Sequence, residues 1–127
     1  MKRFSSRTRT TGCLAFAALV IALTAGAPAR AAPPADGRVV NCLPPHYPGL
    51  GYFTSLTVSS TTCATGNKVA IAYYRCRLRN GVKGRCEGGV LGFRCTEKRV
   101  SIPTEIDARV TCVKGSERVI HTYQQDT

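Results

Sequence analysis

The fold is decided between residues 60 and 81, which read STTCATGNKVAIAYYRCRLRNG. Three hydroxyl residues at 60–62 can cap the first turn of a helix, and Gly81 is a residue type at which helices commonly end. Apolar residues recur in between at the spacing of one helical face, at Val69, Ala72, Tyr73 and Cys76. The sequence therefore predicts one helix from about residue 62 to residue 79.

Apolar and polar residues alternate on both sides of this helix, which is typical of half-buried strands. The alternation occupies residues 55–59, 91–96, 107–112 and 118–123. A turn at residues 114–116 fits a hairpin between the last two stretches. We predict a small disulfide-stabilised α+β domain, with one helix packed on an antiparallel sheet of three to four strands.

Residues 1–31 have the layout of a cleaved signal peptide. Basic residues at the start precede an apolar run over residues 13–23, which is shorter than the roughly 20 residues that span a bilayer. Ala29-Arg30-Ala31 fits the pattern that signal peptidase reads, so Ala32 is the expected new N-terminus. The sequence thus predicts a secreted, extracellular protein with no integral membrane segment after cleavage.

The next stretch, residues 32–51, is rich in proline and glycine. Such a composition disfavours regular structure, so we expect a loose N-terminal arm before a folded domain over residues 52–127. Cys42 would tie this arm to the domain. His46 and Tyr47 lie between prolines, either as an exposed recognition loop or as part of a tether packed on the domain.

Cleavage would leave a small, basic, cysteine-containing chain. The remaining 96 residues hold 13 basic and seven acidic side chains, a net charge of +6. Six cysteines remain, and an even number in a small exported chain predicts three disulfides. They are Cys42, Cys63, Cys76, Cys86, Cys95 and Cys112.

The spacing of the cysteines suggests a pairing but does not settle it. Cys76 and Cys86 flank a turn and form one candidate pair. Cys63, at the helix start, would then reach one of the two cysteines on the later strands, and Cys42 would bond to the other. Zinc is disfavoured, because there is no C-x-x-C pair and His46 and His121 alone are available to join the thiols. We expect no metal and no cofactor.

The densest charged feature is a basic cluster at the end of the helix and in the following turn. Its members are Arg75, Arg77, Arg79, Lys83 and Arg85. Such a cluster attracts anionic polymers such as teichoic acids, acidic glycans or nucleic acid. The alternative is a solvated surface that complements the helix dipole. No motif for sequence-specific reading of nucleic acid is present.

The sequence contains no recognisable catalytic arrangement. A nucleophile needs a nearby base, and the two histidines, His46 and His121, fall in the arm and on the last strand. We expect His121 to be half-exposed there. A nuclease using both histidines, with Lys68 or an arginine stabilising the transition state and the basic cluster holding the substrate, is one alternative. The acidic residues fit surface charge pairing better than a pair of glycosidase carboxylates: Glu87, Glu97, Glu105 and Asp107.

These observations favour a secreted small basic binding module over an enzyme, with no catalytic residue assigned. Its partner would be an anionic polymer of the cell surface. The first alternative is an inhibitor or ligand of an exported protein, in which a loop inside a Cys76–Cys86 bridge enters a protease pocket. A rigid, disulfide-closed loop lowers the entropic cost of such binding. The second alternative is the small nuclease.

Three segments resemble small cysteine-containing exported domains of high-GC Gram-positive bacteria, a group without an assigned function. They are residues 60–70, 90–95 and 109–115, and the resemblance extends over residues 52–123. It rests on a cysteine at a helix start, a GF-x-C strand and a final V-x-C-x-x-G hairpin. The resemblance implies the same architecture and an extracytoplasmic bacterial setting, and it implies no activity.

Overall fold

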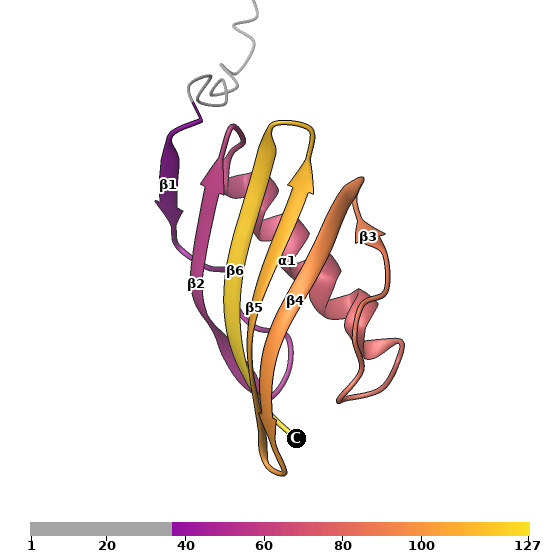
Figure 1. Cartoon of the computed structure of the whole chain (residues 1–127). Helices are drawn as coiled ribbons and strands as arrows, with labels where there is room; N and C mark the ends of the chain where they lie inside the picture. Colours follow the sequence, from indigo (N-terminus) through magenta and orange to yellow (C-terminus); the bar gives the residue numbers. More distant parts are fainter. Residues whose placement is uncertain (1–36) are drawn as a thin grey trace, which may run out of the picture. The chain divides into compact units, whose positions relative to one another are not determined.

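The computed structural model describes residues 37–127, so the predicted signal peptide and the start of the arm lie outside the described part. These residues form six antiparallel strands in the order β1-β2-β6-β5-β4-β3, curled around one helix (Figure 1). The elements are β1 (Val39–Cys42), β2 (Gly51–Ser59), α1 (Cys63–Leu78), β3 (Gly89–Val90), β4 (Phe93–Ile102), β5 (Glu105–Lys114) and β6 (Glu117–Asp126).

The predicted sheet of three to four strands is wrong, because the described chain is mostly sheet and has six strands. The two missed strands are the edges. β3 has two residues, too few to show alternation, and forms because its partner β4 follows a tight turn. β1 lies inside the proline-rich arm, where no regular structure was expected, and pairs along its whole length with β2. The four residues of β1 contain no proline, so each can join the ladder.

The helix prediction of residues 62–79 is confirmed by α1, Cys63–Leu78. The Thr62 side chain accepts a hydrogen bond from the Thr65 backbone N–H at 3.1 Å, which caps the first turn. Val69 and Tyr73 on the inner side of the helix are buried against the sheet. α1 therefore covers one face of the sheet, and the core lies between the two layers.

All six cysteines of the described part form disulfides, as predicted in number. The Cys76–Cys86 pair is confirmed. The link from the helix start to a later strand is wrong: Cys63 bonds to Cys42, and the two strand cysteines bond to each other. The reason is register, because those two cysteines lie directly opposite on β4 and β5.

Three disulfides indicate an oxidising setting outside the cytoplasm, either extracellular or periplasmic. The helix found in the described residues is not long and apolar enough to cross a membrane.

Candidate binding surface

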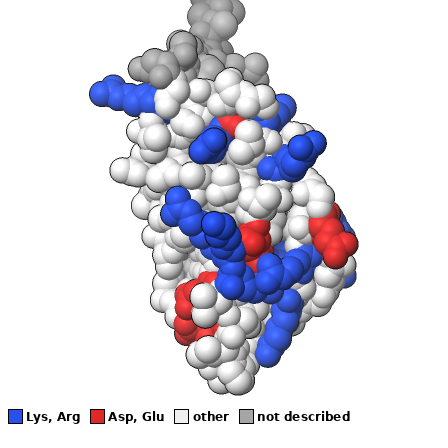
Figure 2. Space-filling model, in the orientation of Figure 1, with Lys and Arg blue, Asp and Glu red and all other residues white. Residues whose placement is uncertain are grey.

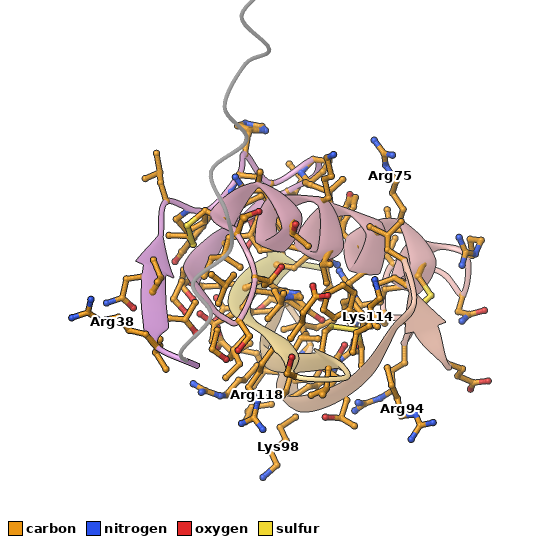
Figure 3. The ribbon with its side chains drawn as sticks, turned by 90° about the horizontal axis from the view of Figure 1, so that it is seen from above. Arg38, Arg75, Arg94, Lys98, Lys114 and Arg118 are labelled. Atoms are coloured by element: carbon orange, nitrogen blue, oxygen red, sulfur yellow. A yellow bond between two sulfur atoms is a disulfide. The ribbon has the colours of Figure 1, made fainter. Side chains whose placement is uncertain are left out.

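The five residues of the predicted basic cluster do not share one surface. Arg75 is exposed and points away from the sheet (Figure 3), while Arg79, Lys83 and Arg85 are exposed just after α1. Arg77 is fully buried. Two residues along a helix correspond to a turn of about 200°, so positions 75 and 77 lie on different faces of α1.

The buried Arg77 guanidinium joins three parts of the chain. It donates to the Val82 carbonyl oxygen at 3.2 Å and to the Tyr47 hydroxyl at 3.0 Å. It also donates to the side-chain oxygen of Gln125, and its carbon lies 4.7 Å from the centre of the Tyr123 ring. Arg77 therefore fastens the arm and the loop after α1 to β6. It is not available to a ligand at the surface.

The loop cations also make contacts within the domain. The Lys83 ammonium donates to the Pro103 carbonyl oxygen at 3.1 Å, which ties the loop to the β4–β5 hairpin. Arg85 lies 3.4 Å from a carboxylate oxygen of Glu97. These contacts leave the predicted cluster with little unengaged charge on one surface.

A second set of basic residues lies on the face of the sheet turned away from α1. Side chains alternate along each strand, so outward positions adjoin buried ones. The outward cations are Arg94 and Lys98 on β4, Arg109 on β5 and Arg118 on β6, all exposed. Figure 3 shows three of them on the side opposite Arg75. Figure 2 views this outer face and shows basic side chains running across its middle. No described element covers it.

The sheet register places two of these cations directly opposite each other. Lys98 pairs with Arg109, which in turn pairs with Thr122 on β6. Thr122 pairs with Ser55 on β2, and their hydroxyl oxygens are 2.6 Å apart. Like charges in this position destabilise a sheet. Neither cation forms an ion pair within residues 37–127. One row across four strands thus offers two cations and two hydroxyls to an anion.

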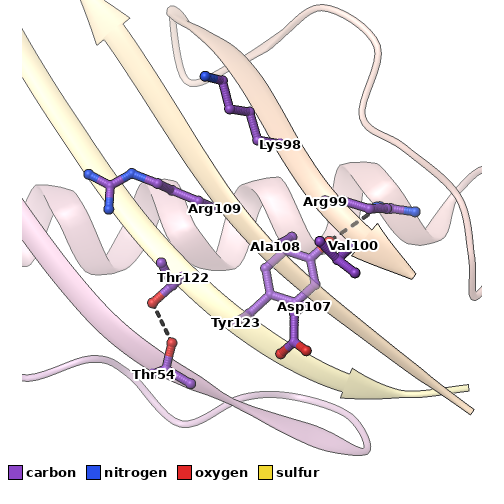
Figure 4. Close-up of a pocket in the computed structure, with 9 residues that line it drawn as sticks. All are labelled: Thr54, Lys98, Arg99, Val100, Asp107, Ala108, Arg109, Thr122 and Tyr123. Carbon is purple, nitrogen blue, oxygen red and sulfur yellow. Dashed lines mark hydrogen bonds between the residues drawn. The ribbon is translucent and has the colours of Figure 1, made fainter. Parts of the chain in front are cut away.

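Lys98, Arg109 and Thr122 of this row line an open hollow of about 370 Å³ (Figure 4). Lys98 and Arg109 extend to the same side, while Asp107, the one acidic residue of the lining, points away from them. The Thr54 and Thr122 hydroxyls are hydrogen-bonded to each other at the other side of the hollow. The lining therefore combines unpaired positive charge with hydroxyl donors.

A buried ion pair holds β4 in place behind this face. The Glu97 and Arg99 side chains are 4% and 6% exposed, and Arg99 donates through Nε to Glu97. Tyr73 on α1 donates to Glu97 at 2.7 Å, and burial together with this bond raises the pKa of Tyr73. Arg99 also donates to the Lys83 carbonyl oxygen at 2.9 Å. Because Glu97 and Arg99 are fixed inward, Lys98 between them is fixed outward.

The two histidines do not meet at a surface. His46 is exposed in the arm, whereas His121 is fully buried between the rings of Phe53 and Tyr73. Burial lowers the pKa of His121 to about 4, and neither ring nitrogen has a hydrogen-bond partner among the described residues. The expectation of a half-exposed His121 is wrong, because this position of β6 faces the core.

The other residues considered for catalysis are spread over the domain. Lys68 is exposed on α1, and Glu87 is exposed in the loop before β3. Glu97 is buried in its ion pair, while Glu105 and Asp107 occupy outward positions on β5. Within the described part of the chain, no three potential metal ligands lie close enough together to hold an ion.

The outward cations were not predicted as a binding surface, although the sequence contains a signal for them. Arg94 lies between Phe93 and Cys95, and Arg109 lies between Ala108 and Val110. Alternation alone therefore puts both arginines on the face opposite the core. What the alternation lacks is the register between strands, which alone brings Arg109 opposite its neighbour on β4.

Comparison with known proteins found no matching family model, no similar curated protein and no similar solved structure. The resemblance to exported domains of high-GC Gram-positive bacteria thus stays a prediction.

Proposed function

We propose that the protein is a secreted binding module that holds an anionic polymer of the cell surface across the outer face of its sheet. The observation that carries the proposal is the like-charge pair of Lys98 and Arg109 on an uncovered face. Such a pair raises the free energy of the unbound fold. An anionic group bound between the two side chains removes the repulsion and releases counterions.

The spacing of the outer cations supports a polymer over a single small anion. Arg94 lies four residues before Lys98 on β4, which corresponds to about 13 Å along the strand. Arg118 lies in the same cross-strand row as Arg94, with Val113 between them. Two cationic rows separated by about 13 Å match a chain that carries repeated charges.

Export through the general secretory route is part of the proposal. Its support is the three disulfides together with the signal-peptide layout of residues 1–31, which lie outside the described part. Mass spectrometry of the protein from culture medium would give a chain that begins at Ala32. A full-length chain retained in the cytoplasm would overturn this part.

The test is binding of the oxidised, exported protein to isolated cell-wall polymer, polyphosphate and polyglutamate over a salt series. We expect the logarithm of the affinity to fall linearly with the logarithm of salt concentration. Replacing Lys98→Gln together with Arg109→Gln should lower the affinity at low salt at least about tenfold and reduce the slope by about 2. The two synthetic chains separate phosphate recognition from carboxylate recognition.

The matched control removes the same charge elsewhere. Lys68→Gln with Arg75→Gln changes two exposed cations of α1, and Figure 3 shows Arg75 on the side away from the outer face. This variant should bind the polymers almost as the wild type does. If both double variants lose affinity for the polymers equally, net charge alone accounts for the binding and the proposal is overturned. Tighter binding to duplex DNA than to wall polymer would also overturn it.

A protease inhibitor is the second candidate, and one observation favours it. The loop closed by Cys76–Cys86 is held from inside, since the Val82 carbonyl oxygen accepts hydrogen bonds from Arg77 and Gln125. A preorganised loop binds at lower entropic cost. Trypsin-like proteases assayed at moderate salt test this candidate. Inhibition that is lost on Lys83→Ala would support the inhibitor function. Full protease activity in the presence of micromolar protein would rule out the inhibitor function.

A further inference from the structure

A second hollow, of about 410 Å³, lies between α1 and the turn that joins β3 to β4. It is lined by Asn67, Lys68, Ile71, Ala72, Arg75 and Leu91. Arg75 points away from the outer face of the sheet, so this hollow is separate from the proposed polymer site (Figure 3). Its volume falls within the range of small-molecule sites, which is about 300–1,000 Å³.

The turn beside the hollow has an unfavourable residue at its first position. Val90 pairs with Phe93, so Leu91 and Gly92 alone form the hairpin turn. Their φ angles are +53° and +80°, the conformation for which asparagine and glycine are preferred. A leucine is strained in this left-handed region. Leu91 is 59% exposed, so burial within the domain does not compensate for the strain.

The lining has the chemistry of an amphiphile site. Ile71, Ala72 and Leu91 supply apolar surface. Lys68 and Arg75 lie on the same face of α1, one turn before and one turn after Ile71 and Ala72. Neither cation has an ion pair within the described residues, and no acidic side chain lines the hollow. Charge complementarity therefore selects a ligand with an anionic group on an apolar body.

We propose that this hollow binds a small anionic amphiphile, in which the apolar body contacts Leu91 and the anionic group contacts Lys68 and Arg75. The proposal explains why an exposed leucine stands where the turn favours asparagine. The Oδ1 atom of Asn67, a residue of the lining, is buried and has no hydrogen-bond partner among the described residues. This site is independent of the polymer site.

The test uses decanoate as the anionic ligand and decanol as its neutral counterpart, both below their aggregation limits. Displacement of the fluorescent probe anilinonaphthalene sulfonate reports binding. Wild-type protein should bind decanoate at least tenfold more tightly than decanol. Lys68→Gln with Arg75→Gln should remove this preference and leave decanol binding unchanged. Lys98→Gln with Arg109→Gln serves as the charge-matched control and should change neither affinity.

Leu91→Asn separates a binding role from a structural one. Asparagine suits the turn, so the thermal midpoint should rise, while the affinity for decanoate should fall at least tenfold. A variant that is more stable and still binds decanoate as the wild type does would overturn the proposal. So would equal wild-type affinity for decanol and decanoate. Self-association that Leu91→Asn abolishes would assign the hollow to a second copy of the chain and overturn it as well.

Discussion

At the scale of the residue, His121 couples the stability of the domain to pH. Burial lowers its pKa from 6.5 to about 4, with the charge of Glu97 acting weakly in the opposite direction. The unfolded chain therefore takes up the proton at higher pH than the folded chain. The free energy of unfolding keeps the full contribution above about pH 6.5 and loses it as the pH falls to about 4.

We expect this loss to reach roughly 3 kcal/mol at pH 4, since one pKa unit corresponds to 1.36 kcal/mol. Urea unfolding at pH 7.5, 6, 5 and 4 measures it. His121→Phe, which puts a ring that does not titrate between Phe53 and Tyr73, should flatten the profile in this window. His46→Ala, at an exposed position, is the control and should leave the profile as it is. A wild-type profile that is flat from pH 7.5 to 5 would contradict the prediction.

At the scale of the element, the approach of α1 to β2 depends on Gly66. A Cβ atom at this position would lie 2.7 Å from Cγ1 of Val58 and 3.5 Å from the methyl carbons of Leu56. Alanine favours a helix by about 1 kcal/mol over glycine, but overpacking costs typically 1–3 kcal/mol. Gly66→Ala should therefore lower the free energy of unfolding, by about 1 kcal/mol.

A double-mutant cycle with Val58→Ala tests the stated cause. Val58→Ala by itself leaves a cavity and destabilises the domain. In that background the clash is gone, so Gly66→Ala should become neutral or stabilising when measured by denaturant unfolding. If Gly66→Ala has the same effect in both backgrounds, the contact with Val58 does not set the distance between helix and sheet.

The Cys42–Cys63 disulfide fixes β1 at the edge of the sheet, because β1 pairs with β2 alone. Replacing both cysteines by serine should lower the free energy of unfolding by about 3 kcal/mol, as expected for a loop of about 20 residues. In this variant, hydrogen exchange should become much faster in residues 39–42 than in β5. Unchanged protection of β1 would mean that its ladder to β2 holds it without the bridge.

The same elements show how far the sequence could predict the fold. Helix α1 was predictable because its cap and its apolar face are both local signals. The second half of β4 was not, because the alternation there is between charged residues: Glu97 and Arg99 face inward and Lys98 faces outward. An inward position for Glu97 can be predicted only when its partner, Tyr73 on α1, is known.

The partner of Cys95 and the outward cations were not predicted, for a shared reason. Cys95 finds its partner through the register of β4 with β5, and the same register brings Lys98 opposite Arg109. Register depends on the whole hydrophobic pattern and on the hairpin at residues 103–104, so it cannot be read from either strand alone. The density of basic residues along the chain indicated residues 75–85 instead. Arg77, which lies between Arg75 and Arg79 in that segment, is buried.

At the scale of the whole molecule, the proposed polymer site and the stability of the fold oppose each other. The outer face keeps Lys98 opposite Arg109 although their repulsion destabilises the sheet. Replacing both by glutamine should therefore raise the free energy of unfolding of the unbound protein by a few tenths of a kcal/mol at low salt. In high salt the gain should vanish, because these exposed charges are then screened.

Bound polymer should reverse the order of stability of the wild type and the double variant. A ligand that binds the folded state alone stabilises it by about 2.7 kcal/mol when its free concentration is 100 times the dissociation constant. Thermal unfolding of wild type with wall polymer should thus show a midpoint higher by about 10 °C. The double variant, with about tenfold weaker binding, should show about half of that shift or less. Since the variant is the more stable protein without polymer and the less stable one with it, a crossing of the two midpoints is the expected signature. If the polymer raises the midpoints of both proteins equally, Lys98 and Arg109 do not contact the polymer. Polymer binding would then not be the reason why these two cations lie opposite each other.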